Sequence, residues 1–238
     1  MSLPGPSLLK NHYWFLRHGR SIPNESGLIV SSLSNGLSPG YGLAASGFIQ
    51  ATSAGELFLK NIQDSGIPAR NIKLFSSPFS RTRQTAEAVT AVLTQHKLHP
   101  TIEFLEDLRE RFFGSPLELQ SHDHYPEIWK IDAQDPMVGS EGGESVADVA
   151  IRVIRALLRI EQEVNGHAVI IVSHGDTLQI LQTVIAHALS GAVTENDSLQ
   201  SHLEEAINPA VLQRHRSFAL ETGELRRLTQ SAAFPTVV

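Results

Sequence analysis

The sequence predicts an α/β fold, a three-layer α/β/α sandwich around a mainly parallel mixed sheet. Short apolar runs alternate along the chain with longer amphipathic segments, and this alternation is typical of βαβ units. The run at 168–172 (AVIIV) is entirely apolar, as expected of a strand that is covered on both faces. Helices are therefore expected on both sides of the sheet.

Four segments are predicted as strands, because each is a short apolar run bounded by polar or glycine-containing sequence. They are residues 12–16 (HYWFL), 72–76 (IKLFS), 101–105 and 168–172. A C-terminal hairpin is predicted to add an antiparallel edge. Its arms would be residues 217–220 and 225–229, joined by a turn at 221–224.

Helices are predicted where apolar residues recur at helical spacing. The segments are residues 46–63, 80–95, 121–131, a segment opened by Ser145, and 175–189. Ser46, Ser80 and Ser145 are predicted N-caps, because a serine hydroxyl can accept from the free N–H groups of a first turn. Residues 21–42 and 190–201 are interpreted as surface loops. No linker divides the chain, so residues 1–238 are predicted to form a single domain.

The composition excludes several classes of function. The 238 residues are 41% hydrophobic with a formal net charge of −6, so the overall charge does not favour nucleic acid or an anionic membrane. Without cysteine, disulfides, thiolate metal ligands and a cysteine nucleophile are impossible. Apolar runs are too short to span a membrane, and residues 1–10 lack a signal-peptide pattern. We therefore expect a cytoplasmic protein with no nucleic-acid or membrane partner.

Charged and imidazole side chains follow the predicted strands. Arg17 and His18 end the first strand, Arg81 follows the second after a short loop, and His174 follows the strand at 168–172. Glu110 comes after the strand at 101–105. Because ligands of parallel sheets bind beyond the carboxyl ends of the strands, we expect these five side chains to meet there.

This set of residue types suits a phosphate group. Arginine binds phosphate oxygens through a planar, bidentate fork. A neutral imidazole such as that of His18 can attack phosphorus once the phosphate charge is neutralised. A carboxylic acid such as Glu110 can protonate the departing oxygen. Each residue alone is more typical of an ordinary loop, so the prediction depends on the whole set at successive strand ends.

Other chemistries have less support. No histidine pair has metal-binding spacing with a third ligand nearby, and Walker-type and Rossmann glycine patterns are absent from the sequence, so neither a metal nor a cofactor is expected. The remaining histidines are interpreted as structural or surface residues: His12, His96, His99, His122, His124, His167, His187, His202 and His215. Residues 23–42 and 112–140 are expected to select the substrate. In the second segment, His122, His124, Tyr125, Trp129 and Lys130 are candidates for the pocket mouth, with core packing favoured for the aromatic residues.

Six ordered motifs resemble the histidine phosphatase superfamily, the phosphoglycerate mutase-like proteins. They are Arg17-His18-Gly19-Arg20-Ser21 followed by Asn24, residues 43–51 (LAASGFIQA), 76–86 (SSPFSRTRQTA), 110–114 (ERFFG), 141–145 (EGGES) and 173–175 (SHG). The resemblance covers most of the chain and implies the family's α/β sandwich.

The resemblance also implies roles for single residues. His18 would be the nucleophile that becomes phosphohistidine, and Glu110 would be the general acid and then the general base. Arg17, Asn24, Arg81 and His174 would hold the phosphate. The implied protein is a phosphoric monoester hydrolase of the histidine acid phosphatase type that acts on small phosphorylated metabolites without metal or cofactor.

Three departures from the family pattern leave alternatives open. Arg20 replaces the usual Glu or Gln, either adding charge at the mouth or lying solvated in a loop. Phe113 stands where mutases carry a tyrosine. The segment between Glu110 and His174 lacks the arginine-bearing insertion typical of mutases, since Arg152, Arg155 and Arg159 are expected on the solvent side of their helix. Hydrolysis is therefore favoured over a cofactor-dependent phosphoglycerate mutase or a catalytically weak phospho-ligand binding protein.

Overall fold

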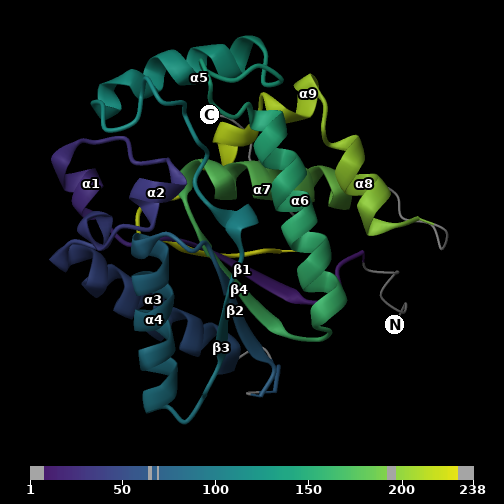
Figure 1. Ribbon diagram of the computed structural model, residues 1–238. Helices are drawn as coiled ribbons and strands as arrows, with labels where there is room; N and C mark the ends of the chain where they lie inside the picture. The colour runs from purple at the N-terminus through teal and green to yellow at the C-terminus, as the bar shows by residue number, and fades with distance from the viewer. Residues whose placement is uncertain (1–7, 64–65, 69, 192–196, 230–238) are drawn as a thin grey trace.

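A five-stranded sheet forms the centre of the computed structural model, which describes residues 8–63, 66–68, 70–191 and 197–229 (Figure 1). The strands are β1 (His12–Arg17), β2 (Ile72–Ser76), β3 (Thr101–Phe104), β4 (Ala168–Ser173) and β5 (Leu225–Arg227). Their order across the sheet is β3-β2-β4-β1-β5. The first four are parallel to one another and β5 runs antiparallel to β1, so the mixed, mainly parallel sheet is confirmed.

Helices cover both faces of this sheet. The helices α3 (Ala45–Gln63) and α4 (Ser80–Gln95) pack on one face, over a core that includes Trp14 and Ile170. On the other face, α6 (Val146–Glu163), α7 (Gly175–Ser190) and α8 (Leu199–Glu205) cover Phe15 and Ile171. Alternate residues of each strand thus enter opposite cores. Figure 1 shows these two layers on either side of the strands, and the predicted three-layer sandwich is confirmed.

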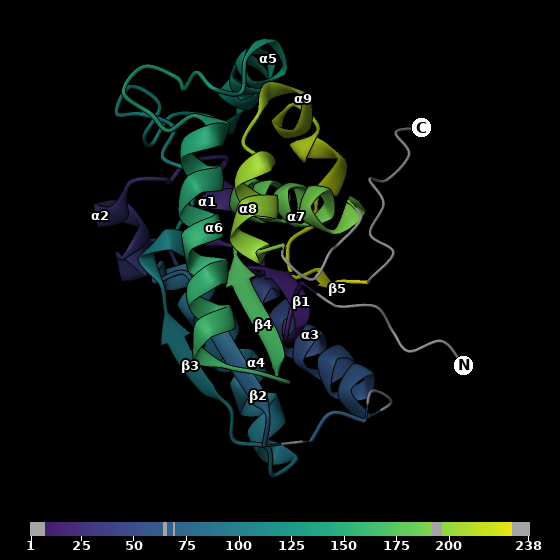
Figure 2. The ribbon, with the colours of Figure 1, turned by 90° about the vertical axis from the view of Figure 1, so that its right-hand side faces the viewer.

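The strand register sets the level of the functional residues. Arg17 of β1 pairs with Ser173 of β4, and Ser76 of β2 pairs with Val172. The residue after each strand, namely His18, Ser77 or His174, therefore emerges at the same edge of the sheet. The short helix α5 (Tyr125–Gln134) and α9 (Pro209–Leu212) lie beyond this edge (Figure 2).

Two segments predicted as surface loops contain helices instead. Residues 21–42 include α1 (Ile22–Ser26), α2 (Leu33–Gly36) and the 3₁₀ turn η1 (Pro39–Tyr41). Within this segment Ile29 and Val30 are buried, whereas Ile22, Leu33 and Leu37 are exposed, so the segment lies at the surface as predicted but is helical and anchored by buried side chains. In the segment 190–201, α7 extends to Ser190 and α8 begins at Leu199, while residues 192–196 lie outside the described residues.

The predicted C-terminal hairpin is wrong in its first arm. Residues His215–Phe218 form the 3₁₀ turn η4, and β5 pairs with β1 instead of with residues 217–220. The antiparallel edge itself is confirmed. Two further 3₁₀ turns are η2 (Glu106–Leu108), which follows β3, and η3 (His122–His124), which directly precedes α5.

Only one of the three predicted serine caps is observed. Ser145 caps α6 in a capping box with Asp148. The helix α3 already begins at Ala45, so Ser46 lies inside it. Phe79 is the N-cap residue of α4, and the Ser80 hydroxyl donates to the Leu37 carbonyl at 2.9 Å. Among the described residues, no helix has both the length and the apolar character needed to cross a membrane.

Candidate active site

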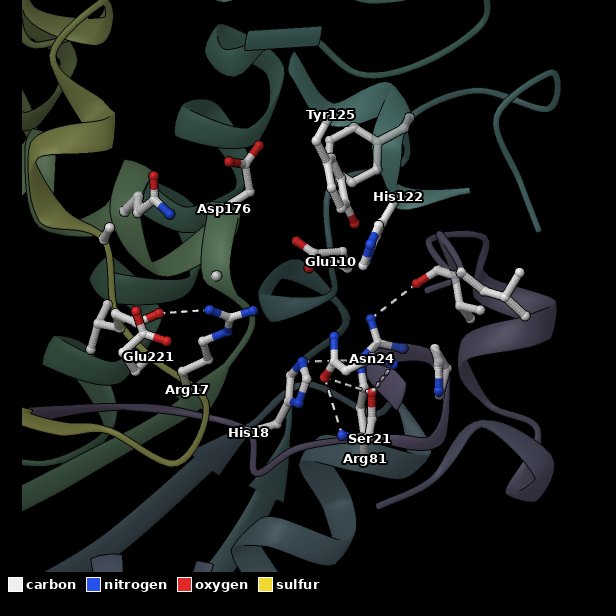
Figure 3. A pocket seen from close by; sticks show the side chains of 18 of the residues that line it. Arg17, His18, Ser21, Asn24, Arg81, Glu110, His122, Tyr125, Asp176 and Glu221 are labelled. Atoms are coloured by element: carbon white, nitrogen blue, oxygen red, sulfur yellow. Dashed lines mark hydrogen bonds between the residues drawn. The ribbon is translucent and has the colours of Figure 1, made fainter. Parts of the chain in front are cut away.

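A cavity of about 330 Å³ opens at the carboxyl ends of the parallel strands. Arg17, His18, Asn24, Arg81 and Glu110, all predicted from the sequence, line it. His18 lies between Arg17 and Arg81 on one side, and Tyr125 and Asp176 lie across from it (Figure 3). The cavity therefore lies between the ends of the strands and the helical segments beyond them.

His18 is 3% exposed, and its two ring nitrogens differ in their protonation. Its Nδ1 lies 2.8 Å from the carbonyl oxygen of Gly19, and because a carbonyl only accepts, Nδ1 carries the ring proton. The lone pair is thus on Nε2. Burial, with the charges of Arg81 and Arg17, lowers the pKa of His18 well below its ordinary value, so the ring is neutral near pH 7.

Arg17 and Arg81 each hold a buried nitrogen without a partner. Arg17 Nη1 donates to the Leu220 carbonyl at 2.6 Å, and Arg81 Nη2 donates to the Val30 carbonyl at 3.0 Å. Arg17 Nε and Arg81 Nη1 are buried with no acceptor among the described residues. Since a buried unpaired N–H is costly, these two donors define a place for an anion beside His18.

Arg81 also contacts two imidazoles. Its Nε lies 3.2 Å from both His18 Nε2 and His174 Nδ1, to which it donates. His174 is fully buried, and its Nε2 lies 2.9 Å from the Ser77 hydroxyl. His174 is thus behind Arg81 rather than in the cavity wall, and its direct contact with phosphate stays a prediction.

Asn24 takes its position from a capping box at the start of α1. Its Oδ1 accepts from the Ser21 backbone N–H at 3.1 Å and from the Ser21 hydroxyl at 2.8 Å. The side-chain amide nitrogen faces the cavity as a result (Figure 3). This places an N–H donor beside His18.

Glu110 is a buried carboxyl at the cavity wall. Its Oε1 accepts from the Arg111 backbone N–H at 3.0 Å, and its Oε2 lies 3.8 Å from His174 Nδ1. Burial raises the pKa of Glu110, as does Asp176, while Arg81 opposes the shift. The protonated acid is therefore favoured over a wider pH range than for an exposed glutamate.

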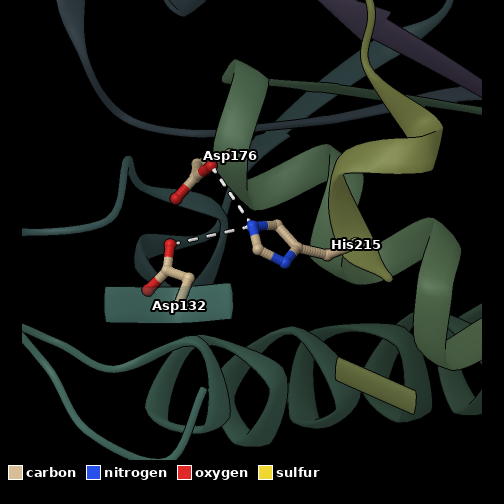
Figure 4. Close-up of side chains that lie close together, drawn as sticks. All are labelled: Asp132, Asp176 and His215. Atoms are coloured by element: carbon tan, nitrogen blue, oxygen red, sulfur yellow. Dashed lines mark ion pairs between the residues drawn. The ribbon is translucent and has the colours of Figure 1, made fainter. Parts of the chain in front are cut away.

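A buried cluster of charges lies behind this wall. The Arg111 guanidinium donates to Asp132 at 2.7 and 2.8 Å and to Asp176 at 3.2 Å. His215 Nε2 lies 3.9 Å from both carboxylates (Figure 4). Asp132, Asp176 and His215 are the described residues whose side chains come closest to a metal-binding arrangement. The Arg111 cation already occupies both carboxylates, so the cluster does not fit a further cation.

Several residues of the cavity wall were missed or misplaced by sequence reasoning. Asp176, Gln179 and Arg216 line the cavity without having been predicted as site residues. Of the five candidates for the pocket mouth, His122, Tyr125 and Trp129 line the cavity, although His122 was also interpreted as structural or surface, whereas His124 and Lys130 do not line it. Tyr125 packs on Phe113 as well, with ring centroids 5.4 Å apart. Asp176 and Gln179 closely follow His174 in the sequence, and this was the available signal for them, whereas Arg216 lies outside both predicted selecting segments.

Two arginine predictions have definite outcomes. Arg152, expected on the solvent side of its helix, is 3% exposed and donates to the carbonyls of Asp107 and Arg109, which precede Glu110. Arg155 and Arg159 are exposed, as predicted. Arg20 does not line the cavity and lies 3.6 Å from Glu25 at the surface, so its solvated-loop interpretation is the one that fits.

Close backbone packing fixes the loop that carries His18. An ideal Cβ on Gly19 would lie 2.2 Å from the Gly47 carbonyl oxygen, and one on Gly47 would lie 2.0 Å from the Arg20 carbonyl oxygen. Two backbones therefore meet here at a distance that only glycine permits. The start of α3 therefore holds the loop of His18 in place.

The fold and the cavity define a class: an α/β protein with a cationic, histidine-containing anion pocket at its strand ends. The sequence model of the histidine phosphatase superfamily (branch 1) matches residues 13–206. The chain belongs to this superfamily, as its motifs predicted.

Individual relatives are more distant. A metal-independent phosphoserine phosphatase of Arabidopsis thaliana is 26% identical over 189 residues, which cover 77% of this chain and 72% of the relative. The solved structure of a mycobacterial glucosyl-3-phosphoglycerate phosphatase superposes with a TM-score of 0.64 at 18% identity, covering 92% of each chain. That of Bacillus stearothermophilus YhfR gives 0.56 at 24%, covering 76% of this chain and 81% of that one. The two structures support the fold.

The glycine contact is testable with a matched pair of variants. Gly47→Ala should lower the free energy of unfolding by about 1–3 kcal/mol through overpacking and weaken binding of inorganic phosphate. Gly40→Ala is the control, because its nearest atom would be 3.7 Å away. Urea unfolding and calorimetry give the two readouts. Equal effects of the two substitutions would contradict the proposed contact.

Proposed function

We propose that this protein is a metal-independent phosphatase that hydrolyses phosphate monoesters of small metabolites through a phosphohistidine on His18. One observation carries this proposal. Two buried, unpaired guanidinium nitrogens, Arg17 Nε and Arg81 Nη1, flank a neutral imidazole whose Nε2 holds the lone pair. The relationship to a metal-independent phosphoserine phosphatase supports it.

In the binding step, a phosphate dianion replaces the missing acceptors of the two arginines. The amide of Asn24 adds a third donor beside His18. Arg81 Nε now donates to His18 Nε2 at 3.2 Å, and a phosphate oxygen can take over this N–H. The lone pair of the nucleophile is then released as the charge of the phosphate is neutralised.

In the first chemical step, His18 Nε2 forms a bond to phosphorus and the bond from phosphorus to the ester oxygen breaks. The departing oxygen takes the proton of Glu110, whose raised pKa keeps that proton available. The Gly19 carbonyl, accepting from Nδ1 at 2.8 Å, stabilises the positive charge that develops on the ring. His174 holds Arg81 in position by accepting from its Nε.

In the second step, the Glu110 carboxylate takes a proton from water. The water oxygen bonds to phosphorus as the bond to Nε2 breaks, which restores the neutral imidazole and releases inorganic phosphate. The same carboxyl thus acts as acid and then as base, as microscopic reversibility of such a pair requires. No metal ion is needed, because the arginines supply the positive charge.

The cavity favours a small substrate. Its volume of about 330 Å³ is at the lower end of the range for small-molecule sites. Besides the phosphate-binding donors, its wall combines aromatic residues such as Trp129 with opposite charges such as Asp176 and Arg216. This mixture suits a small phosphorylated metabolite better than a densely anionic polyphosphate.

Phosphate release from a panel of small monoesters, measured with EDTA present, tests this function. We expect EDTA-resistant turnover that falls by at least about a hundredfold in His18→Ala, because covalent catalysis is removed. The matched control His12→Ala removes an exposed imidazole from the start of β1 and should keep full activity. Phosphoglycerate mutase turnover without phosphate release would contradict hydrolysis, and binding without turnover would favour a phospho-ligand binding protein.

Glu110 can be tested through the leaving group. Glu110→Gln should lower kcat/KM by roughly 10²–10⁴-fold for an alkyl phosphate, but far less for 4-nitrophenyl phosphate, whose phenolate leaves without a proton. In the unsubstituted protein, kcat/KM should fall as the pH rises through the raised pKa of Glu110, and this limb should vanish in the variant. Glu106→Gln removes an exposed carboxylate from the same segment and serves as the control. An equal loss with both leaving groups would refute the acid role.

A further inference from the structure

A second charged region lies across the cavity from His18. We define the distal wall as Trp129, Asp176, Gln179 and Arg216, all of which line the cavity. Trp129 comes from α5, Arg216 comes from η4, and the other two lie one turn apart on α7. This region takes no part in the phosphate chemistry described above.

Arg216 lies over an aromatic ring and has no polar partner among the described residues. Its guanidinium carbon lies 3.6 Å from the centroid of the Trp129 ring. Its side chain has no hydrogen bond or ion pair to any residue within 8–63, 66–68, 70–191 or 197–229. A stacked guanidinium keeps the N–H groups of its edge free for bidentate bonding to a planar carboxylate.

The buried charge cluster fixes this geometry from behind. Asp132, three residues after Trp129, is joined to Arg111 at 2.7 and 2.8 Å. His215, directly before Arg216, lies 3.9 Å from Asp132 and from Asp176 (Figure 4). The cluster therefore links α5, η4 and α7, so that Trp129 and Arg216 are positioned before a ligand arrives.

Acceptors lie beside this cation on α7. Asp176 Oδ2 accepts from Arg111 at 3.2 Å, and Oδ1 lies 3.9 Å from His215 Nε2. Gln179 is 7% exposed, and its Oε1 is buried without a donor among the described residues. A carboxylate and an unpaired amide oxygen can both accept from an ammonium group.

We propose that the distal wall binds an amino acid group, with Arg216 taking its carboxylate and Asp176 and Gln179 its ammonium. The substrates would be O-phosphorylated amino acids, whose phosphate ester lies at the His18 end of the cavity. This inference rests on the proposed phosphatase function. A neutral sugar would leave Arg216 unpaired, and a second phosphate dianion would meet the Asp176 carboxylate. A relative named as a phosphoserine phosphatase agrees with this class.

Four monoesters separate the contributions of the two charged groups. O-phosphoserine carries both, O-phosphoethanolamine lacks the carboxylate, 3-phosphoglycerate lacks the ammonium, and 4-nitrophenyl phosphate lacks both. We expect kcat/KM for O-phosphoserine to exceed that for O-phosphoethanolamine by about 10- to 100-fold, the range of one charge-assisted pair. Equal values for these two alkyl esters would overturn the proposal.

Two arginine variants provide the matched comparison. Arg216→Met should raise KM for O-phosphoserine about 10- to 100-fold, with a smaller effect on kcat, and should abolish the preference over O-phosphoethanolamine. The effect on 4-nitrophenyl phosphate should be much smaller. Arg20→Met, which removes an exposed arginine outside the cavity, should keep the preference. A loss of preference in Arg20→Met, or its retention in Arg216→Met, would refute the assignment.

Binding separates a failure of this subsite from a failure of the phosphatase function. If no ester is hydrolysed, the proposed function fails, and calorimetry on His18→Ala then tests the distal wall alone. O-phosphoserine should bind more tightly than O-phosphoethanolamine, and adding Arg216→Met should remove this difference while inorganic phosphate binding persists. Equal affinities for the two esters in His18→Ala would overturn the proposal whether or not turnover occurs.

Discussion

Burial of the Arg81 guanidinium beside two imidazoles is the constraint on which the site depends. A buried cation is costly unless it is paired, yet Arg81 has one nitrogen without an acceptor and another shared between His18 and His174. Burial, reinforced by the same charge, lowers the pKa of each imidazole and keeps both neutral. In the proposed mechanism, a phosphate dianion would relieve the unpaired charge and leave a neutral imidazole next to phosphorus. Binding and activation thus have one electrostatic origin.

The fold supplies this arrangement through the register of its parallel strands. Because β1 and β4 end level with each other, the imidazoles of His18 and His174 meet at one edge with ring centroids 5.2 Å apart. The backbone contact of Gly19 with Gly47 fixes the nucleophile loop against α3. On the opposite side of the cavity, the buried charge cluster around Arg111 connects α5, α7 and η4. The two ends of the cavity therefore have separate supports, and we propose that one end binds the phosphate and the other binds the rest of the substrate.

The sequence predicted those features of the fold and the site that depend on local patterns of residues. The strands were predicted to within a few residues because apolar runs report burial directly, and His18, Arg81 and Glu110 were found because they follow those runs. The helices in residues 21–42 were missed, because the burial of Ile29 comes from contacts with Phe113 and Ile128, far away in the sequence. Helical periodicity put Arg152 on the polar face of α6, but carbonyls of the segment before Glu110 cover it. Trp129 was a candidate for the pocket mouth, but its contact with Arg216 gave no signal, because only the folded chain brings these two side chains together.

The most direct test of the central claim is to identify the atom that carries phosphate during turnover. The protein would be mixed rapidly with a slow monoester and quenched in alkali, in which phosphohistidine survives. Peptide mapping and ³¹P NMR would then locate the phosphate. We expect it on His18 Nε2, because Nδ1 donates to the Gly19 carbonyl at 2.8 Å. Phosphate on Nδ1 or on another residue, or turnover with no phosphoenzyme at any mixing time, would contradict the mechanism.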